Sequence, residues 1–243
     1  MEATLYGVRI SHPARAALLM LRHKAIETKQ VQIPPGAQRV AMRAFGFPGG
    51  TVPGLKLDGK RVQGSTAISR ALDEAVPEPP LFPRDPERRA AVEEAERWGD
   101  SVYQPVPRRI FRWSVATNGQ LRRRFVEAAR MPAPPITSRA LWPVTQLYMR
   151  AEHGGEAAAR ADVAALPQHL DHVDELIATG VINGLELNAA DFQIGTTTRV
   201  LMNFSQLRPL IEGRPAAEHA LRVAPDFGRP LPLEIPADWI PAA

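Results

Sequence analysis

The sequence contains no cysteine among its 243 residues. This excludes disulfides, thiolate metal sites and a cysteine nucleophile, so any thiol in the chemistry has to arrive as a small molecule. No apolar stretch approaches the roughly 20 residues that span a membrane. The N-terminus lacks the basic start and apolar core of a signal peptide. We therefore expect a cytoplasmic protein without a membrane partner.

Lysine is also scarce: it occurs only at positions 24, 29, 56 and 60, so most of the 30 basic residues are arginine. The net charge of +4 is modest. The two arginine clusters, within 108–112 and 122–124, are interpreted as solvated helix faces and not as a nucleic-acid surface. A hydrophobic content of 44% and a charged content of 23% indicate an ordinary folded chain of one or two domains.

The stretch 49–73 predicts a strand, a hairpin turn, a second strand and a helix. Apolar residues alternate with polar or small ones up to Leu57, which is the spacing of a strand. Asp58-Gly59 is a strong two-residue turn signal. The return strand is Lys60–Gln63, and the helix begins at Gly64-Ser65 because apolar residues then follow at helical spacing.

Two features of this stretch suggest a ligand site. If the Val52-Pro53 bond is cis, the N–H and C=O groups of Val52 turn outward and are free to pair with an extended ligand. The free N–H groups and the dipole at the helix start favour a carboxylate, and the Ser65 hydroxyl adds a donor. A plain helix cap is the alternative interpretation of Ser65.

The chain divides at a proline-rich run, 76–86, which can neither continue a helix nor pair inside a sheet. We predict a first domain of residues 1–78 and an all-helical domain of residues 87–243. Before the stretch 49–73, we predict a strand at 4–10, a helix at 14–24, a strand at 31–33 and a short helix at 37–44. After the run, we predict helices at 87–116 with a kink at Pro105 and Pro107, and at 118–130, 138–152, 157–178, 188–201 and 212–222, with a proline-rich loop at 131–136.

The helix after Asn188 carries its own start signal. The Asn188 side chain can accept from the Asp191 N–H, and the Asp191 carboxylate can reach back to the Asn188 N–H, which is a capping box. We interpret both residues as structural.

These patterns resemble a known family. Thr51-Val52-Pro53, followed by Gly64-Ser65-Thr66-Ala67-Ile68, resembles the glutathione-binding half of the glutathione S-transferase family, in which (V/I)-P with a cis proline precedes (E/Q)-S-x-A-I. The resemblance implies an α+β thioredoxin-like domain followed by an all-α helical bundle. It also implies a homodimer that uses glutathione as cosubstrate, with no bound cofactor or metal.

The resemblance implies a set of thiol-binding residues as well. The set comprises Arg39, Val52, Pro53, Gln63, Gly64 and Ser65. Gly64 departs from the family pattern, because it stands where an acidic or amide residue is usual, and Gln63 lies one place earlier. The identity of the thiol is therefore open.

Ser11 is the predicted catalytic residue. It follows the first strand and precedes the first helix, and the run from Ser11 to Ile26 resembles the serine-class pattern S-x-x-x-x-R-V-x-x-A-L-x-x-K-G-I. Ala16 and Ala25 depart from that pattern, which usually has a basic residue and a glycine there. Tyr6 is the rival, since other classes use a tyrosine near the end of the first strand. A simple helix cap is the alternative role for Ser11.

The proposed chemistry is activation of a thiol. A free thiol has a pKa near 8.5, and lowering it by about two units requires roughly 2.7 kcal/mol of thiolate stabilisation. One hydroxyl aimed at the sulfur near a helix N-terminus supplies a charge-assisted hydrogen bond of about that strength. A Ser11-His12 hydrolase is discounted, because neighbouring residues rarely form a nucleophile–base pair and no third member is evident.

The implied electrophile site lies between the domains, against the first long helix of the second one. Its candidate lining residues are His12, Tyr103, Arg109, Phe111 and Trp113. Packing in the core or exposure on the surface is the alternative for each. His169 and His172 are spaced i, i+3 on a helix, and we interpret them as part of a solvated face, not as metal ligands.

The sequence thus predicts a detoxifying transferase that adds a small-molecule thiol to a hydrophobic electrophile. Two alternatives stay open. The chain could keep the fold as a non-catalytic ligand-binding or stress protein, or it could use a thiol other than glutathione, such as mycothiol.

Overall fold

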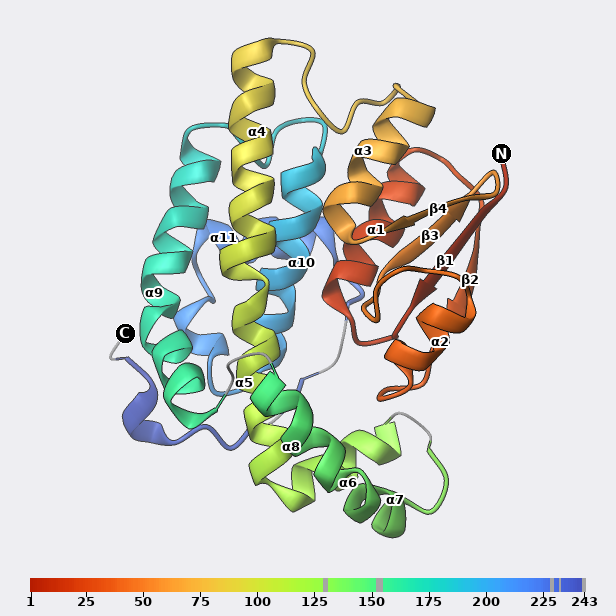
Figure 1. Ribbon diagram of the computed structural model, residues 1–243. Helices are drawn as coiled ribbons and strands as arrows, with labels where there is room; N and C mark the ends of the chain where they lie inside the picture. Colours follow the sequence, from red (N-terminus) through yellow and green to blue (C-terminus); the bar gives the residue numbers. More distant parts are fainter. Residues whose placement is uncertain (129–130, 152–154, 228–229, 232, 242–243) are drawn as a thin grey trace.

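The computed structural model describes residues 1–128, 131–151, 155–227, 230–231 and 233–241. Its N-terminal domain is built on a four-stranded mixed sheet in the order β2-β1-β3-β4 (Figure 1). The strands are β1 (Ala3–Gly7), β2 (Thr28–Gln32), β3 (Gly54–Leu57) and β4 (Lys60–Gln63). β1 runs parallel to β2 and antiparallel to β3, and β3 and β4 form the hairpin predicted at Asp58-Gly59.

Three helices flank this sheet: α1 (His12–His23), α2 (Gln38–Ala44) and α3 (Ser65–Ala75). Figure 1 shows α1 and α3 between the sheet and the helical domain, with α2 on the far side. Met42 of α2 packs in a separate small core with Val8, Ile33 and Phe47, whereas α1 and α3 share the main core with the helical domain.

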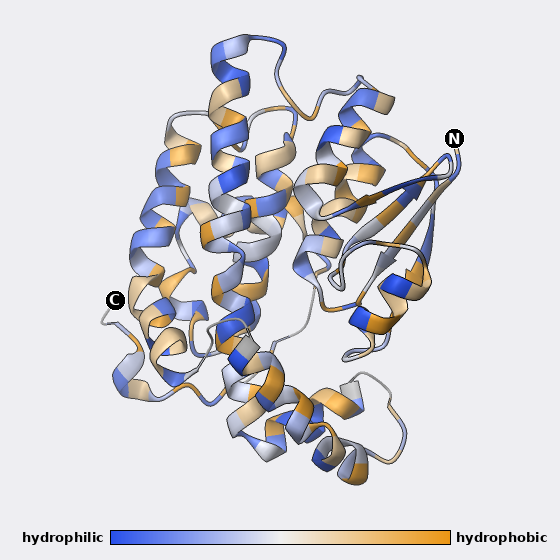
Figure 2. Cartoon of the chain, viewed as in Figure 1, coloured by the Kyte–Doolittle hydropathy of each residue, from blue (hydrophilic) through white to orange (hydrophobic). Residues whose placement is uncertain are grey.

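The helical domain begins at α4 and ends at α11. Its helices are α4 (Pro86–Trp98), the π-helical turn η1 (Gly99–Tyr103), α5 (Pro105–Thr117), α6 (Gly119–Ala128), α7 (Pro134–Ala140), α8 (Trp142–Ala151), α9 (Glu156–Ala178), α10 (Ala189–Asn203) and α11 (Pro215–Val223). Two 3₁₀ turns, Arg208–Leu210 and Ala237–Trp239, follow α10 and α11. Hydrophobic and hydrophilic residues alternate along α4 and α9, as in amphipathic helices (Figure 2).

The predicted fold class is confirmed, and several predicted elements were wrong in detail, among them the second strand, which is Thr28–Gln32 and not 31–33. The first strand ends at Gly7 instead of continuing to Ile10. The long helix changes to a π-helical turn at η1 while its backbone stays helical, and Pro105 and Pro107 stand in the first turn of α5 directly after this turn. The segment predicted as a loop up to Ile136 contains the start of α7, because Pro134 and Pro135 occupy initial helical positions that suit proline.

Buried Lys24 binds the segment 76–85, which connects the two domains, through hydrogen bonds. Its ammonium group donates to the Asp73 carboxylate at 3.0 Å and to the carbonyl oxygens of Val76 and Pro79 at 2.6 Å each. The side chain is fully buried, so this lysine has exchanged water for protein acceptors. The domain boundaries predicted at 78 and 87 flank this segment and stay a prediction.

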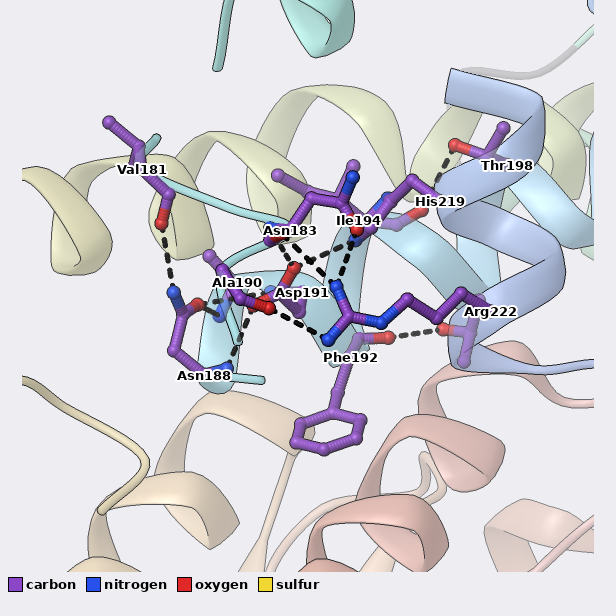
Figure 3. A network of polar contacts seen from close by, with 12 residues as sticks. Val181, Asn183, Asn188, Ala190, Asp191, Phe192, Ile194, Thr198, His219 and Arg222 are labelled. Atoms are coloured by element: carbon purple, nitrogen blue, oxygen red, sulfur yellow. Dashed lines mark hydrogen bonds and ion pairs between the residues drawn. The ribbon is translucent and has the colours of Figure 1, made fainter. Parts of the chain in front are cut away.

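The capping box predicted for α10 is present (Figure 3). Asn188 Oδ1 accepts from the Asp191 N–H at 3.1 Å, and Asp191 Oδ2 accepts from the Asn188 N–H at 2.8 Å. The other oxygen of Asp191 accepts from the Asn183 N–H and lies 2.8 Å from Nε2 of buried His219. Arg222 donates to carbonyl oxygens of residues 183–185, so α11 closes over the start of α10.

Candidate functional site

Sheet register brings three predicted site segments to one end of the sheet. Tyr6, at the end of β1, pairs with Gly54, the first residue of β3, and Gly54 pairs with Gln63, the last residue of β4. The loop to Ser11, the segment before β3 and the start of α3 therefore emerge side by side. β2 is parallel to β1 and ends there too, which brings α2 to the same end.

The Val52-Pro53 peptide bond is cis, as the sequence interpretation required. The Pro53 carbonyl accepts from the Gly64 N–H at 2.9 Å. Within the described residues, the N–H and C=O groups of Val52 have no hydrogen-bond partner, so this backbone edge is available to a ligand.

Gln63 braces this edge. Its carboxamide accepts from the Gly49 N–H at 2.7 Å and donates to the Thr51 carbonyl at 2.7 Å. Both ends of the side chain are thus engaged with the loop that leads into Val52, and Gln63 orders the loop.

Arg39 of α2 reaches the same loop. Its stem lies so close to Gly50 that a Cβ on that glycine would stand 2.7 Å from Arg39 Cγ. The Arg39 side chain is exposed beside the loop.

The start of α3 is open to an anion. Gly64 has φ +95°, a left-handed conformation that favours glycine, and a Cβ placed on it would meet no atom within 4 Å. No side chain caps this helix, and the first intrahelical bond runs from the Ile68 N–H to the Gly64 carbonyl. The N–H groups of Ser65, Thr66 and Ala67 therefore stay available, which is the usual anion-binding arrangement of a helix N-terminus.

Asp100 faces this helix start from the helical domain, and the sequence interpretation missed it. Its Oδ1 accepts from Ser65 Oγ at 3.5 Å, from Gln104 Nε2 at 3.0 Å and from Gln193 Nε2 at 3.4 Å. Ser65 is nearly buried at 2% exposure. Gln193 Oε1 is buried and has no hydrogen-bond partner in the described part of the chain. No sequence signal joins these residues, because they come from three elements far apart in the chain.

The π-helical turn that carries Asp100 depends on Gly99. A Cβ at Gly99 would stand 3.0 Å from Ile194 and 3.1 Å from Gln193, both in α10. A larger residue would push η1 away from α10 and separate Asp100 from Gln193. Such π-helical turns inside longer helices occur frequently at functional sites.

Ser11 caps α1, as its alternative interpretation predicted, and lies partly exposed at the predicted site. Its Oγ accepts from the Ala14 N–H at a long 3.4 Å. Accepting that bond leaves the hydroxyl hydrogen free to be donated elsewhere. The two roles of Ser11, cap and donor, are therefore compatible.

His12 is 6% exposed and ties the Ser11 loop to the helical domain. Its Nε2 lies 3.2 Å from the Gln104 carbonyl. Burial and, secondarily, the positive charge of Arg108 lower the pKa of His12 to about 3. The imidazole is therefore neutral at physiological pH and donates from Nε2.

The other aromatic candidates pack against neighbours. The Tyr103 hydroxyl lies 3.1 Å from Thr198 Oγ1, its side chain is fully buried, and burial raises its pKa. Trp113 is 8% exposed and contacts Trp239. Tyr6, the rival to Ser11, packs its ring 4.7 Å from Phe45.

Arg109 and Phe111 lie on α5 with partners of their own. Arg109 binds the Asp162 carboxylate through two nitrogens, at 2.6 and 2.5 Å. The Phe111 ring packs 5.4 Å from that of Phe125. Of the predicted electrophile-site residues, His12 is thus the one that adjoins the predicted thiol site.

No group of three or more His, Asp or Glu side chains in the described ranges is arranged to hold a metal ion. His172 and His169 both pack against the Trp98 ring, at 4.5 and 6.0 Å. Within the same ranges, no helix combines the length and the apolar character needed to cross a membrane.

Comparison with known proteins agrees with this architecture. The family described as "Glutathione S-transferase, N-terminal domain" matches residues 5–80. A search of curated protein sequences finds no match.

Solved structures match over nearly the whole chain. A glutathione S-transferase from Rhodospirillum rubrum is 19% identical with a TM-score of 0.60, covering 98% of this chain and 97% of its own. The β-etherase LigF from Sphingobium is 20% identical with a TM-score of 0.61, covering 91% and 99%. A Tau class glutathione S-transferase from mango, Mangifera indica, is 16% identical with a TM-score of 0.61, covering 99% and 93%. Residues 5–80 thus match the N-terminal domain of glutathione S-transferases, and the chain has the two-domain fold of the glutathione S-transferase structures.

Proposed function

We propose that this protein is a glutathione transferase that activates a small-molecule thiol through Ser11 and transfers it to a hydrophobic electrophile. The carrying observation is the sheet register, which gathers Ser11, the open Val52 edge and the uncapped start of α3 at one end of the sheet. These three supply a hydroxyl donor, a backbone edge for an extended ligand and an anion site.

The thiol is held in three places. The peptide backbone of the thiol pairs with Val52, a terminal carboxylate binds the N–H groups of Ser65 and Thr66, and a second carboxylate meets exposed Arg39. The sulfur then lies near Ser11, whose hydroxyl donates to the thiolate. This donation favours the ionised form of the sulfur, which is the nucleophile.

Exposed apolar side chains next to Ser11 and along α2 support a hydrophobic electrophile. Ile10, directly before Ser11, is 49% exposed, Val40 on α2 is 76% exposed, and Phe45, the residue after α2, is 39% exposed. Exposed apolar side chains beside a nucleophile lose unfavourable contact with water when an apolar substrate covers them. We propose further that the protein acts in the cytoplasm as a homodimer in detoxification.

Calorimetry with glutathione tests the thiol site. The variant Ser65→Ala should bind glutathione about tenfold more weakly, because the Ser65 hydroxyl, whose contact with Asp100 is a long 3.5 Å, is a further donor to the ligand carboxylate and is lost in this variant. Ser101→Ala is the matched control, because the Ser101 hydroxyl is exposed on η1 and donates to the Arg97 carbonyl. Glutathione binding that is unaffected by Ser65→Ala contradicts this assignment.

The open space at Gly64 favours a second candidate, in which the thiol is not glutathione. The family pattern places an acidic or amide side chain there, whereas here a Cβ would meet nothing within 4 Å. A thiol with a bulkier head group, such as mycothiol, fits that space. Binding of mycothiol in preference to glutathione supports this candidate, and binding of neither thiol supports a non-catalytic ligand-binding or stress protein.

A further inference from the structure

The positive charge of this protein is concentrated in one part of the helical domain. Residues 119–151, the range that includes α6, α7 and α8, contain six arginines and one glutamate. The rest of the chain holds 24 basic and 25 acidic side chains, so the net charge of +4 arises in this segment. Such charge asymmetry is typical of contact with an anionic surface.

The three helices form a cluster at one end of the molecule, apart from the sheet and from α4 (Figure 1). One side of this cluster packs on the preceding helices. Gln146 donates to the Ala116 carbonyl of α5 at 3.0 Å, and Arg122 of α6 donates to the Val115 carbonyl of α5 at 2.8 Å.

The opposite side of α7 and α8 is exposed and apolar. Leu141 joins the two helices in a right-handed helical conformation, with i→i−4 hydrogen bonds of 2.9 Å on either side of it. The helical spacing therefore carries over from one helix to the next. Exposed residues recur at this helical spacing, every four or three residues, and form one stripe: Ile136, Ala140, Pro143, Leu147 and Arg150.

The large side chains of this side are well exposed. Ile136 is 70%, Leu147 66% and neighbouring Trp142 50% accessible to water. Arg139 and Arg150 are exposed beside them. Hydrophobic and strongly hydrophilic residues adjoin in this cluster (Figure 2). Arginines that flank an exposed aromatic and aliphatic stripe are the signature of a helix that lies in a membrane interface.

A basic cavity opens beside the stripe. It has a volume of about 780 Å³ and lies where the end of α5 meets α6 and α7. Arg122, Arg123 and Arg139 line it, with Glu234 as the one acidic residue among its lining. Arg123 forms an ion pair with Glu127 at 3.0 Å. Arg139 has no ion-pair partner in the described part of the chain.

We propose that α6–α8 docks on an anionic phospholipid surface. Ile136 and Leu147 of the stripe, with neighbouring Trp142, enter the boundary between head groups and acyl chains. The cavity beside Arg139 accepts a lipid phosphate, and Arg150 contacts the head groups at the edge. A peripheral contact of this kind needs no membrane-spanning helix. It would place a transferase for apolar electrophiles at the lipid phase, in which such compounds dissolve.

Charge complementarity and exposed apolar area support a lipid surface over a nucleic acid. Nucleic-acid affinity comes from phosphate contacts by basic side chains, and it gains nothing from burying an isoleucine and a leucine. Binding to a lipid interface is strengthened by the basic side chains and by the apolar side chains, since apolar burial and attraction to anionic head groups add together.

Vesicle co-sedimentation of the full-length protein tests this proposal. The vesicles contain phosphatidylcholine alone or an equal mixture of phosphatidylcholine and phosphatidylglycerol. We expect binding to the mixture, weakening as salt is added. The double variant Arg139→Glu/Arg150→Glu should bind at least about 25-fold more weakly, since each arginine near the surface contributes about fivefold. Leu147→Ser should also weaken binding, at unchanged circular dichroism.

Matched controls separate a specific surface from a general charge effect. Lys29→Glu/Lys60→Glu makes the same charge change on the exposed side of the sheet, and Leu185→Ser removes a fully exposed leucine elsewhere. Both controls should bind the mixed vesicles as the parent protein does. Equal loss in the controls contradicts the proposal.

Three other outcomes overturn the proposal. The first is that the protein sediments equally with both kinds of vesicle or does not sediment with either. The second is binding to duplex DNA that depends on Arg139 and Arg150 but not on Leu147, which assigns the surface to nucleic acid. The third is saturable binding of inorganic phosphate that Arg139→Glu abolishes in a protein that does not sediment with vesicles, which assigns the cavity to a soluble anion.

Discussion

Asp100 Oδ1 lies 3.5 Å from Ser65 Oγ and thereby joins the helical domain to the first turn of α3. The same oxygen accepts from the side chains of Gln104 and Gln193. Gln104 also offers its carbonyl to His12, the residue after Ser11. The π-helical turn and the residue that follows it therefore contact both the start of α3, where we propose the anion site, and the loop that carries Ser11.

Removing the Asp100 carboxylate should loosen this junction. Asp100→Ala leaves the Ser65 hydroxyl and two amide groups without their shared acceptor, and it should lower the free energy of unfolding by about 1–2 kcal/mol, because part of the site stays hydrated. Asp100→Asn keeps one acceptor oxygen and should cost less. Urea denaturation measures both, and equal stability of Asp100→Ala and the parent protein contradicts the described network.

Replacing Ser11 tests its proposed role as donor to the sulfur. Ser11→Ala should lower kcat/KM for thiol conjugation at pH 7 by about 25-fold, because a thiol pKa that returns to near 8.5 leaves only a few per cent of the thiolate. The apparent pKa of the pH–rate profile should rise by about two units. Ser11→Thr, which keeps a hydroxyl, is the control. A variant that lost only the helix cap would be destabilised by about 1 kcal/mol without this change in the pH profile.

A side chain at Gly64 tests which thiol the site takes. Gly64→Gln restores the family pattern in open space, at a backbone cost of about 1–3 kcal/mol, because φ +95° with ψ +145° is a conformation that residues other than glycine rarely adopt. If glutathione is the cosubstrate, its affinity should rise in this variant. Gly64→Ala is the matched control, since it carries the same strain without the amide. Weaker glutathione binding by Gly64→Gln than by Gly64→Ala counts against glutathione.

Lys24 should be essential for the connection between the domains. Lys24→Met removes the charge that Asp73 and the carbonyls of Val76 and Pro79 share. Both carbonyls lose their ammonium donor, and Asp73 keeps only the hydrogen bond from the Leu81 N–H. We expect a loss of about 3–5 kcal/mol in the free energy of unfolding. Lys29→Met, at an exposed site on β2, should change stability by less than about 0.5 kcal/mol. Thermal unfolding of both variants checks this contrast.

His12 should make stability depend on pH. Its pKa of about 3 in the folded protein lies below the unfolded value of 6.5, so the unfolded chain binds the extra proton between these limits. The contribution of His12 is complete above pH 6.5 and is lost as pH falls toward 3, at about 1.4 kcal/mol per pH unit. His12→Gln should flatten this part of the curve of unfolding free energy against pH. An unchanged slope contradicts the assignment of a buried neutral imidazole.

Much of the N-terminal domain was predictable from local pattern. Alternation up to Leu57, the Asp58-Gly59 turn and the helical spacing after Ser65 each act over a few residues, so the elements followed from the sequence. The all-helical character of the second domain followed in the same way. The π-helical turn at Gly99 did not, because it depends on how closely α10 approaches, which no local spacing encodes.

The predicted site residues show the same difference between local sequence pattern and tertiary packing. Val52, Pro53 and Ser65 carry a motif whose chemistry is local: a peptide geometry and a helix start. The sequence alone therefore determined the fold class and the elements at which a thiol site was predicted. Only the tertiary structure placed Asp100 against Ser65, directed the Gln63 side chain to Gly49 and Thr51, and buried Tyr103. Hydrogen bonds and burial between segments distant in the sequence depend on how those segments pack, which no local pattern determines.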